Sequence, residues 1–72
     1  MINEKICEKI RLERLKRKYT QEEFADITGL SRNMIWKIET KRVSPTVKTL
    51  EKIAKALDME FSELTDVSKV DL

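Results

Sequence analysis

Residues 20–39, TQEEFADITGLSRNMIWKIE, decide the fold when they are read together with residues 44–57, SPTVKTLEKIAKAL. In the first stretch, two short amphipathic runs meet at Gly29, the only glycine of the chain, and the small residue Ala25 lies four positions before it. Glycine permits a sharp turn, and a small residue lets two helices approach closely where they cross. The pattern predicts two short helices that cross steeply through a turn of about three to four residues.

Capping signals set the limits of these two helices. Thr20 and Glu23 have the spacing of a capping box, which satisfies free backbone N–H groups at a helix start. Gly29 suits the left-handed residue that follows the end of a helix. Ser31 can then cap a second helix over residues 32–39.

The apolar spacing elsewhere predicts three further helices, over residues 3–18, 45–57 and 61–66. Glycine and proline occur once each, and no useful run alternates with a period of two residues. The sequence therefore predicts an all-α fold, a compact five-helix bundle. Residues 1–66 form its single domain, and residues 67–72 form a short C-terminal tail with little to pack.

Helical periodicity also assigns the inward-facing positions. They are Ile2, Ile6, Ile10, Phe24, Ala25, Thr28, Met34, Ile35, Ile38, Val47, Leu50, Ile53, Ala54 and Leu57. Cys7 is expected to be a small buried hydrophobe of the first helix. Leu12 and Leu15 fall off the apolar stripe of that helix and meet either a late helix or a second subunit.

Composition excludes several classes of protein. The 72 residues include one cysteine and no histidine, so an intrachain disulfide and a zinc site are both excluded, and no metal or cofactor is expected. An enzyme is disfavoured because there is no glycine-rich phosphate loop and no nucleophile paired with a base. The densely charged first twenty residues leave no signal peptide or membrane span, which favours a cytoplasmic protein. No small-molecule ligand is evident from the sequence.

Charge is unevenly distributed, although the net charge is only +2. Residues 1–19 carry seven Lys or Arg against three Glu, and residues 32–43 carry four against Glu39 alone. Residues 20–31 and 44–72 are net acidic. Taken alone, this charge fits an ordinary solvated surface, but a basic stripe on a balanced chain is also typical of a DNA-binding protein.

The chain resembles the phage-repressor type of helix-turn-helix domain, the Cro/cI-like or XRE-like family, over about residues 10–64. The matching residues are Gln21, Ala25, Gly29, Ser31, Ile35, Glu39, Pro45, Leu50, Ile53, Ala54 and Leu57. The resemblance implies a domain whose second motif helix enters the major groove of double-stranded DNA. Lys18, Lys41 and Asp58 stand where the family usually has glycine, and Glu13 stands where it usually has an apolar residue.

The exposed face expected for residues 32–39 carries side chains that can recognise bases. Arg32 can donate two hydrogen bonds to guanine, and Asn33 can pair with adenine. Lys37 can reach a guanine edge or a phosphate. The family's base-reading positions match these three residues and Trp36. The tryptophan presses on a thymine methyl group or the sugar–phosphate wall, folds back over Lys37, or belongs to a protein interface.

Other positions are expected to contact phosphate or to hold the domain together. Candidate phosphate contacts are Gln21, Ser31, Lys41 and Arg42, assisted by Arg11 or Lys18. By the same resemblance, Arg14 and Glu39 should form a partly buried ion pair that fixes the angle of the reading helix.

The function most consistent with these residues is sequence-specific regulation of transcription, by repression or autoregulation. The short reading helix covers few base pairs, so a homodimer on a palindromic operator is expected, with Phe61, Leu64 and Leu15 at its interface. A protein–protein interaction module on the same fold is the alternative. A phage repressor, a restriction-modification controller and an antitoxin remain open within the DNA-binding class.

Overall fold

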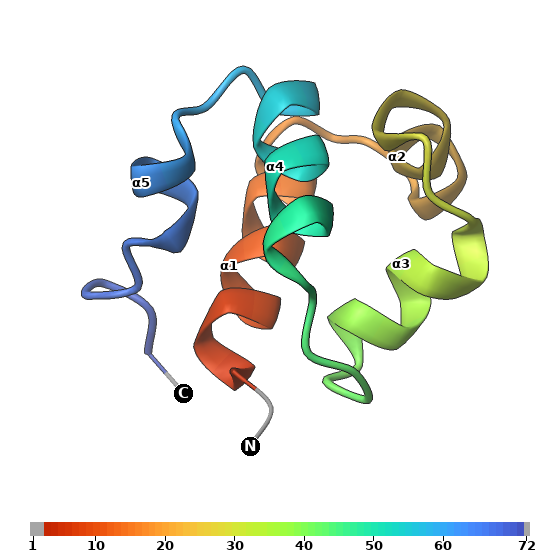
Figure 1. The fold of residues 1–72 in the computed structure, drawn as a ribbon. Helices are drawn as coiled ribbons and strands as arrows, with labels where there is room; N and C mark the ends of the chain where they lie inside the picture. The colour runs from red at the N-terminus through yellow and green to blue at the C-terminus, as the bar shows by residue number, and fades with distance from the viewer. Residues whose placement is uncertain (1–2, 72) are drawn as a thin grey trace.

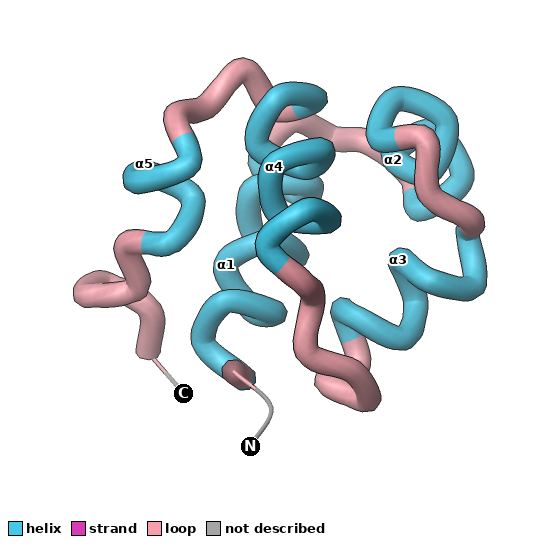
Figure 2. Tube along the Cα trace, viewed as in Figure 1, coloured by secondary structure: helices cyan, strands magenta, loops and turns pink. Residues whose placement is uncertain are grey.

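The computed structural model describes residues 3–71. Its helices are α1 (Glu4–Lys16), α2 (Gln21–Thr28), α3 (Arg32–Glu39), α4 (Val47–Ala56) and α5 (Phe61–Thr65). Helices and loops account for all of these residues (Figure 2), so the predicted all-α bundle is confirmed. In Figure 1, α1 and α4 lie in the middle of the view, with α2 and α3 on one side of them and α5 on the other.

Side-chain caps begin the helices where the sequence predicts them. The Thr20 hydroxyl accepts from the amide of Glu23 at 3.0 Å, and the Glu23 carboxylate accepts from the amide of Thr20 at 2.8 Å. Ser31 accepts from the amide of Met34 at 3.0 Å. Both predicted caps are confirmed. Pro45 lies outside α4, because Thr46 is the capping residue.

Three helices end in the same left-handed turn without a glycine. Lys18, Lys41 and Asp58 have φ angles of 62°, 64° and 56°. After each helix, two successive amides bond back to carbonyls of its last turn; after α4 these are Asp58 N to Lys55 O (3.1 Å) and Met59 N to Ala54 O (2.9 Å). This is the Schellman arrangement, which normally favours glycine at its left-handed residue. The three positions where the family usually has glycine are therefore left-handed here as well.

Asp58→Gly is expected to raise the free energy of unfolding by about 0.5–1 kcal/mol. A left-handed conformation costs a non-glycine residue about 1–2 kcal/mol, and the extra unfolded-state entropy of glycine offsets only part of that. The corresponding rise in Tm, a few degrees for a domain of this size, is measured by thermal denaturation. Lys55→Gly is the control, since this exposed residue has ordinary helical geometry and its replacement should lower Tm. An equal or lower Tm for Asp58→Gly would contradict the strain argument.

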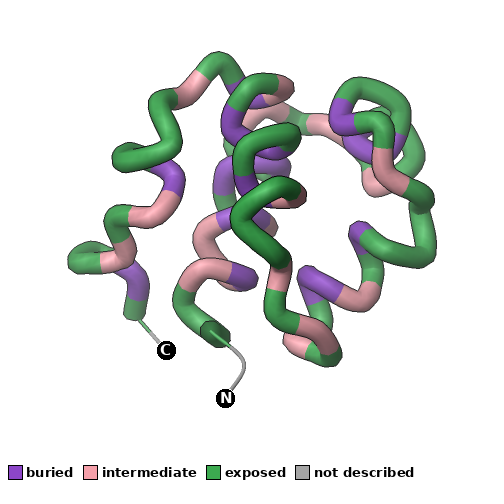
Figure 3. The backbone as a smooth tube through the Cα atoms, in the orientation of Figure 1, coloured by how far each residue is buried: buried purple, intermediate pink, exposed green. Residues whose placement is uncertain are grey.

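The core contains residues of all five helices, and buried positions recur on the inner sides of these helices (Figure 3). It contains Cys7, Ile10, Phe24, Ala25, Ile35, Ile38, Leu50, Ile53, Ala54, Leu57 and Leu64. The prediction for Cys7 is confirmed, because the side chain is fully buried and its thiol donates to the carbonyl of Val43 at 3.5 Å. Burial raises the pKa of this thiol.

Two predictions about the core and one about the tail were wrong. Val47, the first residue of α4, is 63% exposed although it lies on the apolar stripe of that helix, and Met34 is exposed beside the buried Ile35 on α3. Val70 is buried, so the tail packs more than expected. Leu12 and Leu15 are both exposed, and no late helix among the described residues covers them. The predictions for Ile2 and for the end of the tail at Leu72 lie outside the described residues.

A polar cluster connects α1 to the end of α4 where the family usually has an apolar residue. Arg17 donates to the Glu13 carboxylate at 2.7 Å and to the Leu57 carbonyl at 3.0 Å. Burial opposes ionisation of Glu13, yet the hydrogen bond from Arg17 and the charge of Lys16 hold its pKa below the usual value. The role of Arg17 was not predicted, although the spacing of an acid four residues before a base indicates such a pair.

Candidate nucleic-acid interface

One face of α3 packs into the core, and the opposite face is exposed to solvent. Ile35 and Ile38 are fully buried, whereas Arg32, Asn33 and Trp36 on the other side are exposed. Lys37 is half-buried. The helix therefore presents to solvent the donors that the sequence assigned to base reading, and base reading by these side chains remains a prediction.

These side chains border a common hollow with the first residue of α2. The hollow has a volume of about 270 Å³ and is lined by Gln21, Arg32, Asn33 and Trp36. Gln21 is the first residue of α2, and Arg32 and Asn33 are the first two residues of α3, so the starts of both helices line the hollow. One candidate phosphate-contacting residue and three candidate base-reading residues are thus brought together, on a concave surface of mixed amide, guanidinium and indole groups.

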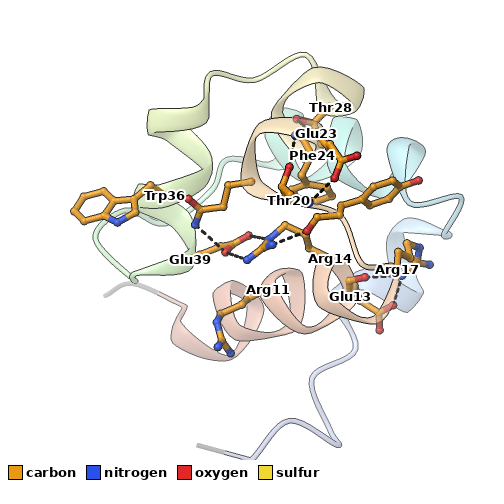
Figure 4. Close-up of polar contacts among 12 residues, drawn as sticks. Arg11, Glu13, Arg14, Arg17, Thr20, Glu23, Phe24, Thr28, Trp36 and Glu39 are labelled. Atoms are coloured by element: carbon orange, nitrogen blue, oxygen red, sulfur yellow. Dashed lines mark hydrogen bonds and ion pairs between the residues drawn. The ribbon is translucent and has the colours of Figure 1, made fainter.

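A buried ion pair fixes α3 against α1 (Figure 4). The Arg14 Nε and Nη2 atoms donate to the two carboxylate oxygens of Glu39 at 2.7 and 2.8 Å, and Arg14 Nη1 donates to the carbonyl of Tyr19 at 2.7 Å. The side chains of Arg14 and Glu39 are only 10% and 3% exposed. Such a bidentate contact is directional, so it constrains the angle of α3 as well as its position.

The same carboxylate extends this network to the hollow. The Gln21 amide nitrogen donates to Glu39 Oε1 at 3.3 Å, so its orientation depends on the Arg14–Glu39 pair. The sequence predicted that Gln21 contacts a DNA phosphate, because this residue lies at the start of a helix. Its amide is in fact committed to a protein carboxylate in this structure, while its side chain still borders the hollow.

Two other candidate phosphate contacts share one acid. Arg11 donates to Glu8 Oε2 at 3.2 Å, and Lys41 Nζ lies 3.5 Å from Glu8 Oε1. Glu8, which the sequence did not single out, therefore holds two cations from α1 and from the turn after α3 in one place. Lys18 is exposed in the turn after α1, and the Ser31 hydroxyl is engaged as the α3 cap.

Arg42 lies over the ring of Trp36, with its Cζ atom 4.9 Å from the ring centroid. Arg42 was predicted to contact phosphate, and one possibility for Trp36 was that it folds over Lys37. The cation on the ring is Arg42 instead. The backbone explains this contact, since the amide of Arg42 bonds to the Lys37 carbonyl at 2.8 Å and so turns the chain back along α3.

Comparison with known proteins identifies the arrangement. The helix-turn-helix family model HTH_3 matches residues 10–64, which include α2, the turn and α3. The chain belongs to this family. No individually curated protein sequence matches the chain significantly.

Solved structures that share the fold of this helix-turn-helix protein include the following two. One is the restriction-modification controller protein C.AhdI from Aeromonas hydrophila, with a TM-score of 0.79 and 30% identity over 83% of this chain and 91% of that one. The other is an HTH_3 family transcriptional regulator from Vibrio cholerae, with a TM-score of 0.80 and 34% identity over 88% of this chain. The match spans only 36% of the Vibrio protein.

The residues predicted for a dimer interface have different environments. Phe61 and Leu15 are exposed at the surface of the helix-turn-helix domain, whereas Leu64 is completely buried. The prediction for Leu64 was wrong, because the side chain packs into the core of the chain itself.

Within residues 3–71, no helix has the length and apolar character needed to cross a bilayer.

Proposed function

We propose that the protein is a sequence-specific regulator of transcription that inserts α3 into the major groove of double-stranded DNA. The observation that carries the proposal is the hollow formed by Gln21, Arg32, Asn33 and Trp36 on the solvent side of α3. Guanidinium and amide groups there can make paired hydrogen bonds to guanine and adenine edges. Family membership and the two regulatory neighbours support the same function.

A homodimer on a palindromic site completes the proposal. An eight-residue reading helix contacts few base pairs, and two copies related by a two-fold axis would read half-sites about 34 Å apart. Exposed Phe61 and Leu15 are the candidate contacts between the copies. Footprinting on a sequence selected from random DNA should show two protected half-sites one helical turn apart at saturation. Protection of one unpaired half-site at saturation would exclude the dimer.

Binding is expected to weaken steeply with salt. Each phosphate neutralised by a cation such as Lys41 releases counterions, and about six to ten such contacts would reduce affinity by about 10³–10⁵ between 50 and 200 mM salt. Fluorescence anisotropy with labelled DNA measures the slope of affinity against salt concentration. Lys41→Ala should weaken binding to all sequences similarly and reduce that slope by about one for each copy bound.

Lys69→Ala is the matched control. Lys69 is exposed in the C-terminal segment, which lies on the opposite side of the bundle from α3 (Figure 1), so its removal should leave the salt dependence unchanged. Affinity that does not change between low and moderate salt would exclude DNA as the ligand. That result would favour the protein–protein module on the same fold.

A role as a restriction-modification controller is a finer proposal for the same domain. It is supported by the similarity to C.AhdI, which covers 91% of that controller. Mapping of binding sites across the genome tests it. Sites beside the genes of a restriction-modification system would support this role, and sites confined to other operons would oppose it.

A further inference from the structure

Trp36 is the only aromatic residue on the exposed side of α3. Tyr19 and Phe24 stack on each other with ring centroids 6.4 Å apart, and Phe61 begins α5. The Trp36 side chain points outward from α3 in Figure 4, and the residue is 41% exposed. It therefore provides the apolar part of a hollow whose other lining residues are Gln21, Arg32 and Asn33.

The position of Arg42 over this ring is set by the backbone. Lys41 is left-handed, and the amides of Lys41 and Arg42 bond to the carbonyls of Ile38 and Lys37 at 3.0 and 2.8 Å. This turn fixes where the Arg42 side chain leaves the main chain. A planar, weakly hydrated guanidinium stacks on an indole in a way that an ammonium does not. The stack restrains the indole while part of it stays open to the hollow.

The hollow thus combines donors for purines with an apolar surface. Arg32 and Asn33 suit the hydrogen-bonding edges of guanine and adenine, but neither recognises the one apolar group in the major groove, the 5-methyl group of thymine. An indole suits that group. We infer that Trp36 reads the 5-methyl group of a pyrimidine and that Arg42 is the residue that positions its ring. This inference rests on the proposed DNA-binding function.

Substitution in the DNA tests the role of Trp36 without altering the protein. In a sequence selected from random DNA, each thymine is replaced in turn by deoxyuridine, which removes only the methyl group. Binding should weaken about fourfold at one position of each half-site, the effect of losing one buried methyl group. In Trp36→Ala, the difference between thymine and uracil at that position should disappear.

A second arm separates the two natural sources of this methyl group. Each cytosine of the same sequence is replaced by 5-methylcytosine. Loss of affinity with deoxyuridine assigns the contact to thymine, and a Trp36-dependent gain with 5-methylcytosine assigns it to a methylated cytosine. If neither substitution has a Trp36-dependent effect, Trp36 does not read a methyl group.

Arg42→Lys tests the positioning role, because it keeps the charge and removes the planar stack. The variant should retain the salt dependence of binding but lose the sensitivity to the pyrimidine methyl group. Emission from the only tryptophan of the chain should also become more accessible to acrylamide in the free protein. An unchanged thymine-to-uracil ratio in Arg42→Lys would show that Arg42 does not position the ring.

Failure of this inference is distinguishable from failure of the proposed function. If no sequence is enriched from random DNA, DNA reading itself is excluded, and the inference with it. If a sequence is enriched and its binding is salt-dependent, but the methyl group has no effect, only the inference about Trp36 and Arg42 is overturned.

Discussion

Glu39→Ala is expected to lower the free energy of unfolding by about 3–5 kcal/mol, a large part of the stability of a domain this small. The substitution leaves the Arg14 guanidinium, 10% exposed, with the carbonyl of Tyr19 as its remaining partner in the network. A buried charge without its counter-ion is poorly solvated, which accounts for the size of the effect. Urea denaturation followed by far-UV circular dichroism measures the loss.

Two further variants make this prediction specific to the pair. Arg14→Ala should destabilise the fold to a similar degree. The double variant should lose less free energy of unfolding than the two single variants lose together. Additive effects would show that the two side chains do not interact in solution. Glu51→Ala removes an exposed carboxylate of α4 and should change stability by less than about 0.5 kcal/mol.

If Glu39→Ala does not fold, Glu39→Gln gives the same information. It keeps one oxygen acceptor for Arg14 and removes the charge, so its destabilisation should be intermediate between wild type and alanine. Because Glu39 also accepts from Gln21, either variant should weaken DNA binding through loss of order around α3. A variant that is clearly destabilised but binds DNA normally would show that DNA binding does not depend on the Glu39 contacts that hold α3 in place.

The helix boundaries could be predicted because their signals are local. The hydroxyl of Thr20 and the missing side chain of Gly29 act within one turn of their own residue, so their effects can be read from sequence. The turns at Lys18, Lys41 and Asp58 carry no such signal, because none of the three is glycine. Their left-handed geometry was suggested only by the family's usual glycines at these positions.

Side-chain environments that depend on neighbouring elements could not be predicted from periodicity. Leu64 lies in a five-residue helix, too short for its apolar spacing to distinguish a core face from an interface. Val47 lies on the apolar stripe of α4 but is exposed at the first residue of the helix, which periodicity alone does not reveal. The sharing of Glu8 by Arg11 and Lys41 joins residues far apart in sequence, and charge counts give no indication of such partners.

Arg32→Ala and Asn33→Ala are each expected to weaken binding to the preferred site by about 1–3 kcal/mol per half-site. Each removes a paired hydrogen bond to one base edge and leaves that base without a protein partner. The loss should therefore be confined to the preferred sequence, with preference relaxed at one base pair and binding to unrelated DNA little changed. Competition between the preferred site and single-base-pair variants measures both effects.

Arg32→Lys distinguishes base reading from phosphate contact at the same position. Lysine keeps the positive charge but cannot present the planar pair of donors that matches guanine, so specificity should fall while the salt dependence stays the same. Both alanine variants should melt at the wild-type temperature, because Arg32 and Asn33 are exposed and lie opposite the buried Ile35 and Ile38. A variant with normal stability that loses affinity equally for all sequences would place Arg32 on the phosphate backbone. In that case, the choice of sequence would depend on Asn33, Trp36 and Lys37.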